Sequence, residues 1–293
     1  MTLAIEISHL SKIFRGKRGA RVEALTDLSL QLPQGEVFGF LGPNGAGKST
    51  TIKTLMGLIT PTSGQARIFG VDAKQSSARL RVGYLPENPS FYDYLTAEEY
   101  LAFVARIFKM EKSRYLEQSR IVLDKVDLWE ARKRTIRGYS KGMVQRLGIA
   151  QALLHDPDLL IFDEPMSGLD PLGRALVKSL ILDLKRAGKT ILFSTHITSD
   201  VEEVCDRFGI LVKGRLRELE NVSDAIAQTI LDYQVETSRA GVKENFRIPK
   251  PELMAKLRQL EADGAEIERI TPASRNLEQI FLAAVAAGET NDR

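Results

Sequence analysis

The segment from residue 42 to residue 49 constrains the fold of this chain more than any other. It reads Gly-Pro-Asn-Gly-Ala-Gly-Lys-Ser, and its spacing of Gly, four residues and Gly-Lys-Ser is typical of a phosphate-binding loop. An apolar run, Val37–Leu41, precedes the loop, and the spacing of Ile52, Leu55 and Met56 predicts a helix after it. A glycine-rich turn between strand and helix directs backbone N–H groups and the positive end of the helix at an anion.

This loop predicts a site for ATP and Mg²⁺. We expect Lys48 to reach the β- and γ-phosphates, Ser49 to bind Mg²⁺ through its hydroxyl group and Thr50 to contact the α-phosphate. The predicted phosphate contacts are Gly42, Pro43, Asn44, Gly45, Ala46, Gly47, Lys48, Ser49 and Thr50. The alternative is a chance match, and the strand–loop–helix setting argues against it.

Two adjacent carboxylates follow a second apolar run. Residues 159–162 read Leu-Leu-Ile-Phe and lead into Asp163 and Glu164. An Asp at the carboxyl end of a strand beside a phosphate loop can hold Mg²⁺ through its water shell. We expect Glu164 to act as the general base that polarises the attacking water. The alternative is a solvated Asp-Glu turn before Pro165.

The order of apolar segments predicts an α/β fold. Residues 159–162 and 190–193 are buried-strand candidates with a helix at 172–186 between them, which indicates a parallel sheet. Residues 5–32 alternate polar and apolar around a polar stretch at 16–21, which favours an antiparallel strand pair. Residues 96–134 have helical spacing.

Composition and charge exclude several classes of protein. The chain has 41 basic and 38 acidic residues, and a net charge of +3 is too small to indicate nucleic acid as a partner. One cysteine, Cys205, excludes an intrachain disulfide and fits a reducing compartment. No apolar stretch approaches the roughly 18 residues of a spanning helix, and the first ten residues do not resemble a secretory signal. We therefore expect a cytoplasmic protein that acts at a membrane only through a partner.

Further motifs, in a fixed order, give the chain a family resemblance. Over residues 3–217 it resembles the ATP-binding subunit of an ABC transporter. Tyr-Ser-Lys-Gly-Met resembles the signature Leu-Ser-Gly-Gly-Gln, Ser-Gly-Leu-Asp matches the loop after the acidic pair, and Gly-Tyr-Leu-Pro-Glu stands at the glutamine loop. These three segments are residues 139–143, 167–170 and 83–87. Phe14 stands where the family usually has an aromatic residue, and His196 matches its switch histidine.

The resemblance implies a fold and a domain division. The expected fold is a P-loop NTPase core of ABC type, with a parallel sheet, an antiparallel β subdomain and a helical subdomain at about residues 90–155. This ATP-binding domain is expected to span residues 1–219. Residues 220–293 are expected to form a small α+β accessory domain that resembles the C-terminal extension of two-component exporters. Helices are expected at residues 221–230, 251–261 and 277–285, and extended segments at 233–237 and 266–270. The apolar helix faces are expected to pack mostly on the domain's own small sheet and to serve assembly or regulation.

The resemblance also implies roles for individual residues. Lys48, Glu164 and His196 are expected to be catalytic, and Phe14 to stack on adenine. Ser140, Lys141 and Gly142, at the start of a helix, are expected to form a second anion cradle that closes on the γ-phosphate held by an opposite subunit. The remaining implied contacts are Asp170 with nucleotide, and Glu87, Ser49 and Asp163 with Mg²⁺.

Several of these roles have ordinary structural alternatives. Ser140 is also a suitable helix N-cap, Phe14 a suitable core residue, and His196 a suitable core or capping histidine. The chain departs from the family pattern where Lys141 replaces glycine, Met143 replaces glutamine and Glu87 replaces glutamine. In the family that the chain resembles, such replacements occur in exporter-type subunits, and the resemblance therefore favours export.

The predicted function is an ATP-hydrolysing subunit that powers export. It would act on the inner face of the cell membrane with a separate transmembrane permease and a second ATP-binding subunit, identical or different. One alternative is a soluble ABC-type ATPase acting on nucleic acid or ribosomes, although the 92 positions from Lys48 to Ser140 leave no room for the long coiled coil of repair ATPases. The other is a protein that binds ATP without hydrolysis, against which Glu164 argues.

Overall fold

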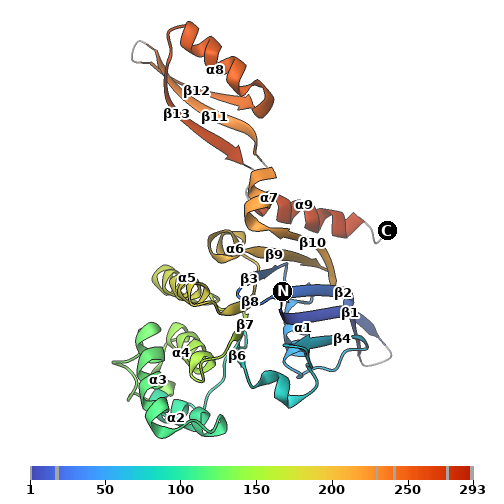
Figure 1. Ribbon diagram of the computed structural model, residues 1–293, viewed down its shortest axis with the longest axis vertical. Helices are drawn as coiled ribbons and strands as arrows, with labels where there is room; N and C mark the ends of the chain where they lie inside the picture. Colours follow the sequence, from blue (N-terminus) through green and yellow to red (C-terminus); the bar gives the residue numbers. More distant parts are fainter. Residues whose placement is uncertain (1, 17–19, 229, 240–241, 275–276, 291–293) are drawn as a thin grey trace.

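The structure is a computed structural model that describes residues 2–16, 20–228, 230–239, 242–274 and 277–290. Its centre is a six-stranded sheet in the order β10-β9-β3-β8-β7-β6 (Figure 1). The five strands from β9 to β6 run parallel, and β10 returns antiparallel to β9. The strands are β3 (Val37–Leu41), β6 (Val82–Leu85), β7 (Leu159–Asp163), β8 (Thr190–Thr195), β9 (Arg207–Val212) and β10 (Arg215–Asn221).

An antiparallel sheet packs beside the central one in the order β2-β1-β4-β5. The predicted strand pair is confirmed as β1 and β2, although part of its polar tip, residues 17–19, lies outside the described residues. The bounds are β1 (Leu3–Arg15), β2 (Arg21–Pro33), β4 (Ser63–Ile68) and β5 (Val71–Asp72).

Two hydrophobic cores explain why the central strands are apolar on both faces. In β3, Phe38 and Phe40 pack into the core shared with the antiparallel sheet and α1 (Lys48–Leu55). The alternate residues Val37 and Leu41 pack into the core on the opposite face. Because successive side chains of a strand point to opposite faces, a strand buried on both sides reads as a continuous apolar run.

We call the core on this opposite face, which contains Val37 and Leu41, the second core. Its helices include α4 (Lys141–Leu153), α5 (Pro171–Arg186) and α6 (Thr198–Val204). The helical stretch expected at residues 96–134 is two helices, α2 (Ala97–Ile107) and α3 (Lys112–Lys125). The helix α2 begins at a capping box, in which Thr96 Oγ1 accepts from Glu99 N at 3.2 Å and Glu99 Oε2 accepts from Thr96 N at 2.8 Å. It ends before Lys109, whose φ of 52° cannot continue a right-handed helix.

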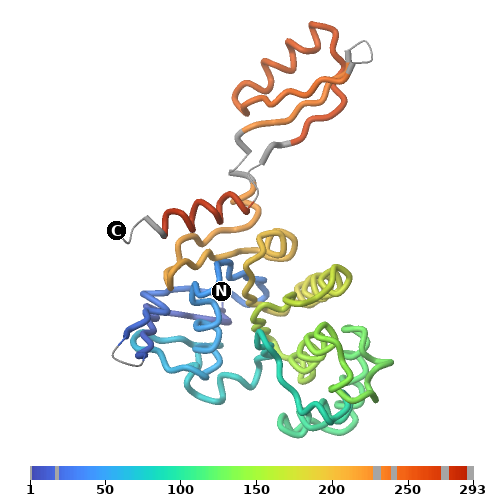
Figure 2. Tube along the Cα trace, turned by 180° about the vertical axis from the view of Figure 1, so that it is seen from behind, coloured from blue at the N-terminus to red at the C-terminus, as the bar shows by residue number. Residues whose placement is uncertain are grey.

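Part of the C-terminal region forms a small unit that stands apart from the rest (Figures 1 and 2). We call residues 230–274 the accessory module. Its sheet has the order β12-β11-β13, and α8 covers one face through the core residues Val235, Ile248 and Leu260. The strand β12 was not predicted from the sequence. The bounds are β11 (Ile230–Arg239), β12 (Val242–Pro249), α8 (Leu253–Ala262) and β13 (Glu266–Ser274).

The helices on either side of the module pack on the core beside the central sheet. In α7 (Val222–Gln228), Val222 and Ala225 belong to the second core, as do Leu277 and Ala284 of α9 (Leu277–Thr290). The prediction that the last helix packs on the module's own sheet is therefore wrong. Its apolar spacing was correctly detected, but periodicity gives no information on which surface an apolar face covers.

Candidate functional site

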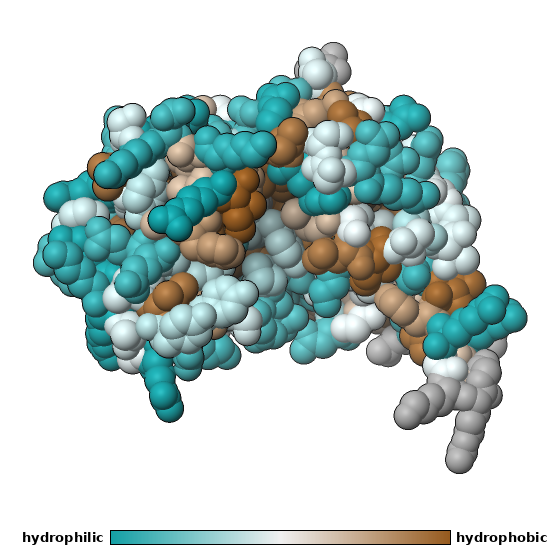
Figure 3. Space-filling model, turned by 90° about the horizontal axis from the view of Figure 1, so that it is seen from below, coloured by the Kyte–Doolittle hydropathy of each residue, from teal (hydrophilic) through white to brown (hydrophobic). Residues whose placement is uncertain are grey.

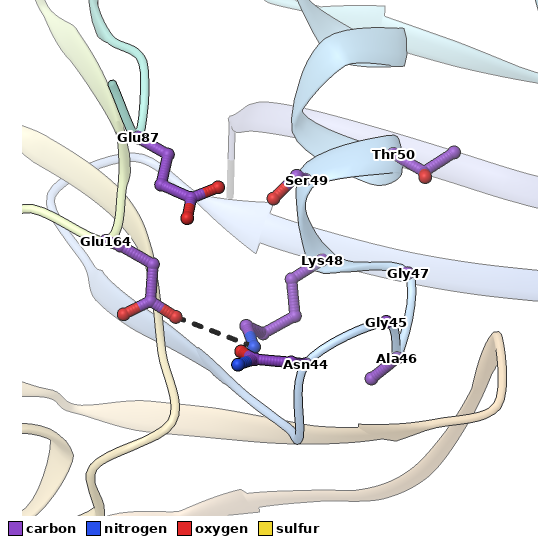
Figure 4. Close-up of a pocket in the computed structure, with 9 residues that line it drawn as sticks. All are labelled: Asn44, Gly45, Ala46, Gly47, Lys48, Ser49, Thr50, Glu87 and Glu164. Atoms are coloured by element: carbon purple, nitrogen blue, oxygen red, sulfur yellow. Dashed lines mark ion pairs between the residues drawn. The ribbon is translucent and has the colours of Figure 1, made fainter. Parts of the chain in front are cut away.

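The phosphate loop connects β3 to α1 as the sequence predicts. Gly45 and Gly47 have φ values of 80° and 109°, which other residues rarely adopt, and a Cβ on Gly47 would lie 2.6 Å from the carbonyl oxygen of Ala24. The loop encloses one side of a cavity of about 250 Å³ (Figure 4). The residues that line it are Asn44, Gly45, Ala46, Gly47, Lys48, Ser49, Thr50, Glu87 and Glu164.

Lys48 extends from the first turn of α1 along the cavity. Its Nζ donates to the carbonyl oxygens of Gly42 at 2.6 Å and Pro43 at 3.2 Å. The same nitrogen lies 3.6 Å from Glu164 Oε1, across the cavity (Figure 4). A buried ammonium group held by oxygen atoms is placed to bind a phosphate that enters beside it.

Asp163 ends β7 next to the phosphate loop and is 1% exposed. Its Oδ1 accepts hydrogen bonds from Ser49 Oγ at 3.1 Å and from Ser194 Oγ at 2.6 Å. Hard cations such as Mg²⁺ bind oxygen ligands, and the hydroxyl of Ser49 and the carboxylates of Asp163 and Glu87 supply them here. The residues present therefore fit a Mg²⁺ ion.

Glu164 follows Asp163 and turns its carboxylate toward the cavity. His196 Nδ1 lies 3.1 Å from Glu164 Oε2 and 3.2 Å from Oε1. The carboxylate thus lies between an imidazole and the ammonium group of Lys48. A carboxylate oriented by a neighbour beside a phosphate cradle can serve as a general base toward water.

Five predicted site residues, Phe14, Ser140, Lys141, Gly142 and Asp170, are neither in this cavity lining nor among the contacts described above. Ser140 caps α4, where its Oγ accepts from Met143 N at 3.2 Å, and Asp170 caps α5 by accepting from Gly173 N at 2.8 Å. Phe14 is 39% exposed, with Lys12 Nζ 5.0 Å from its ring centre. Within this chain, Ser140 and Asp170 act as caps, and the predicted nucleotide roles of Phe14, Ser140, Lys141, Gly142 and Asp170 remain predictions.

Two buried polar residues at the acidic pair were not predicted as site residues. Ser194 Oγ contacts both Asp163 and Glu164, and Gln145 Nε2 donates to the carbonyl oxygens of Glu164 at 3.3 Å and Pro165 at 3.2 Å. Ser194 lies in the Ser-Thr-His run that includes His196, and this is the only signal that pointed to it. Asp163 has a further effect nearby, because burial and its negative charge raise the pKa of Tyr84 to about 12.

These features define a P-loop nucleotide-binding domain: a phosphate loop between a strand and a helix, and an acidic pair, distant in sequence, beside a histidine. The family model for the ABC transporter matches residues 25–167. The protein YxlF of Bacillus subtilis, named as an ABC transporter ATP-binding protein, is 37% identical over 90% of this chain and 95% of its own length. This chain therefore belongs to the ABC transporter ATP-binding proteins, and its nucleotide-binding part is an ABC ATPase domain.

Other relatives match different shares of the chain. The bacitracin transport ATP-binding protein BcrA of Bacillus licheniformis is 35% identical over 98% of this chain and 99% of its own. A Synechocystis ABC transporter ATP-binding protein is 47% identical over 72% of this chain, and the match spans only 61% of that protein. The match therefore covers about three fifths of the Synechocystis relative.

Solved structures share the fold. An ATP-binding subunit of an ABC transporter superposes with a TM-score of 0.69, at 34% identity over 77% of this chain and 92% of the other. An ATP-binding cassette solved as a dimer with ADP and Pi also gives 0.69, at 23% identity over 74% and 98%. The predicted fold class is confirmed. In the part of the chain that the structure describes, no helix has both the length and the apolarity needed to cross a membrane.

Proposed function

We propose that this chain hydrolyses ATP with Mg²⁺ and powers transport through a separate transmembrane subunit. The observation that carries the proposal is the position of the Glu164 carboxylate, 3.6 Å from Lys48 Nζ and 3.1 Å from His196 Nδ1 at the edge of the phosphate loop. Lys48 binds and orients the phosphates, and Glu164 accepts a proton from the attacking water. Bound Mg²⁺ would supply charge neutralisation at the phosphates, with Ser49, Asp163 and Glu87 as the residues that hold it.

Export is the direction we propose, with action on the inner face of the cell membrane. The similarity over nearly the full length of both chains to a protein named for bacitracin transport supports a role in transport. The direction rests on the resemblance to exporter-type subunits. A second ATP-binding subunit, identical or different, is proposed as a partner, because Ser140, Lys141 and Gly142 do not line this chain's own cavity. No observation favours the alternative of a soluble ATPase acting on nucleic acid or ribosomes.

A surface for the transmembrane partner is proposed on the helical subdomain. Tyr92, Tyr94 and Phe103 are exposed aromatic residues, and the ring centre of Tyr92 lies 6.0 Å from that of Tyr94 and 6.2 Å from that of Phe103. Figure 3 views the molecule from the end at which Figure 1 places α2, and hydrophobic residues gather there around a hollow between two lobes. Exposed apolar clusters of this kind mark sites for protein partners.

The test of the proposal is phosphate release by the purified chain. We expect Mg²⁺-dependent hydrolysis that nucleic acid does not stimulate. Lys48→Ala should weaken the binding of a fluorescent ATP analogue at least tenfold, because a charge-assisted contact contributes about 1.5–3 kcal/mol. Lys53→Ala, an exposed lysine on the same helix, is the matched control. Unchanged affinity in a folded Lys48→Ala protein would refute the phosphate site.

A further inference from the structure

The backbone of Glu164 has an unusual conformation. Its φ is 51°, in the left-handed region that residues with a Cβ adopt rarely. Such a residue persists only where its surroundings hold it, and conformations of this kind gather at functional sites. This backbone conformation sets the direction of the Cα–Cβ bond of Glu164. The direction of the carboxylate therefore depends on it.

Two buried side chains hold the peptide groups on either side of Glu164. On one side, Ser194 Oγ accepts from Glu164 N at 2.9 Å. On the other, Gln145 Nε2 donates to Glu164 O at 3.3 Å. Ser194 is 0% exposed and Gln145 is 4% exposed. They come from different elements, β8 and α4, so the backbone of Glu164 is fixed between a strand of the central sheet and the helix that begins after Ser140.

Ser194 has a second contact that Gln145 lacks. Its hydroxyl donates to Asp163 Oδ1 at 2.6 Å, and its Cα is the register partner of Asp163 in the β7–β8 ladder. One hydroxyl group therefore fixes both the carboxylate of Asp163 and the N–H of Glu164. A buried hydroxyl that only filled space would leave its polar atom without a partner at a free-energy cost, whereas both contacts of Ser194 go to the acidic pair.

We propose that Ser194 and Gln145 are positioning residues for ATP hydrolysis. Both hold the backbone that aims the Glu164 carboxylate, and Ser194 also holds the Asp163 carboxylate, which would bind Mg²⁺. The inference rests on the proposed function. It predicts different defects for substitutions at the two positions, because only Ser194 contacts Asp163, which is expected to hold Mg²⁺.

The test compares Ser194→Ala and Gln145→Leu with wild type. Ser119→Ala is the matched control, because Ser119 is a buried serine whose hydroxyl donates to Leu116 O in the helical subdomain. We expect both test variants to lower kcat about tenfold. Ser194→Ala should also raise the Mg²⁺ concentration for half-maximal rate several-fold, whereas Gln145→Leu should leave it unchanged. Ser194→Thr, which keeps the hydroxyl, should restore the Mg²⁺ dependence of the wild type.

A binding measurement without turnover gives a second readout. The affinity of a non-hydrolysable ATP analogue is measured with Mg²⁺ and with EDTA. Ser194→Ala should lose several-fold in affinity only with Mg²⁺, and Gln145→Leu should lose none. If Ser194→Ala does not fold, Ser194→Cys, with a weak S–H donor of similar volume, is measured in both assays.

Two results would overturn the inference. One is wild-type kcat and Mg²⁺ dependence in a folded Ser194→Ala protein. The other is an equal loss of activity in Ser119→Ala, which would show a general effect of buried serines. If wild type itself releases no phosphate, the proposed function fails, and the Mg²⁺-dependent affinity alone decides whether Ser194 orients Asp163.

Discussion

Ser140 shows how one residue can serve a structural role and still be suited to a second one. Its hydroxyl caps α4, and the N-terminus of that helix carries partial positive charge. If Ser140 and Gly142 contact a nucleotide held by another subunit, Ser140→Arg should place a bulky charge in that interface. It should spare ATP binding by the single chain, whose own loop lies at Lys48, and abolish cooperative hydrolysis.

The control for this prediction separates the cap from the interface. Ser140→Ala removes only the cap, which should cost about 1 kcal/mol of unfolding free energy and leave more activity than Ser140→Arg. The rate of phosphate release against protein concentration measures the cooperativity. Full activity in Ser140→Arg would mean that this segment does not act across a dimer.

The residues at the site differ in how well the sequence reveals them. Lys48, Ser49, Asp163 and Glu164 were predictable because each stands in a local pattern, either the glycine-rich loop or the end of an apolar strand. The roles of Ser194 and Gln145 were not, because they arise from contacts 30 and 19 positions away from Glu164. The approach of two elements in space leaves no periodic signal in either one.

At the scale of elements, a ring contact joins the end of α2 to the segment that follows α4. The ring of His155, between α4 and β7, stacks on Phe108 at the end of α2, with ring centres 3.8 Å apart. Burial lowers the pKa of His155 to about 4, an effect that nearby Lys189 and Arg114 reinforce and Asp156 opposes. The histidine is therefore neutral in the folded protein above about pH 4.

This pKa shift predicts a loss of stability in acid. Because the unfolded histidine has a pKa near 6.5, the unfolded state binds more protons than the folded state between about pH 6.5 and pH 4. The free energy of unfolding should therefore fall as the pH drops through that window, by about 2 kcal/mol between pH 7 and pH 5. Urea unfolding of wild type and His155→Leu at both pH values measures it, and an equal pH dependence in the two proteins would contradict it.

Elements were predicted best where their pattern is local. The strands β3, β7 and β8 and the helices α1 and α5 follow from apolar runs and periodicity. The strand β12 was missed, because half of its run Val-Lys-Glu-Asn-Phe-Arg-Ile-Pro is polar and three polar residues in succession interrupt the alternation. It is an edge strand of the module with one face in the small core, so its few apolar residues suffice.

At the scale of the whole molecule, the accessory module is an insertion whose ends meet. Ile230 and Ser274 are register partners in the β11–β13 ladder, and Cα atoms of such partners are about 4.5–5.5 Å apart. A two-residue turn can join them. The helices α7 and α9 would stay in place, since both are part of the second core.

We therefore predict that replacing residues 231–273 by two glycines preserves ATP binding and hydrolysis within about twofold, while transport with a membrane partner declines. Truncation after Arg217 is the contrasting variant, because it also removes α7 and α9. Loss of α9 exposes the apolar surface that Leu277 covers. This should lower the free energy of unfolding by about 1.5–3 kcal/mol for each large side chain that is no longer buried. Thermal unfolding and phosphate release measure both variants. Loss of nucleotide binding in a well-folded excision variant would place the module in the catalytic site.

The central claim is that Glu164 is the general base of an ATPase built on the loop at Lys48. The most direct measurement is the turnover and ATP affinity of Glu164→Gln beside wild type. The amide keeps the size of the side chain but cannot accept the proton of water, so kcat should fall at least a hundredfold while ATP still binds. Light scattering should then show an ATP-dependent dimer. Wild-type turnover in Glu164→Gln would contradict the account and assign the base to another group.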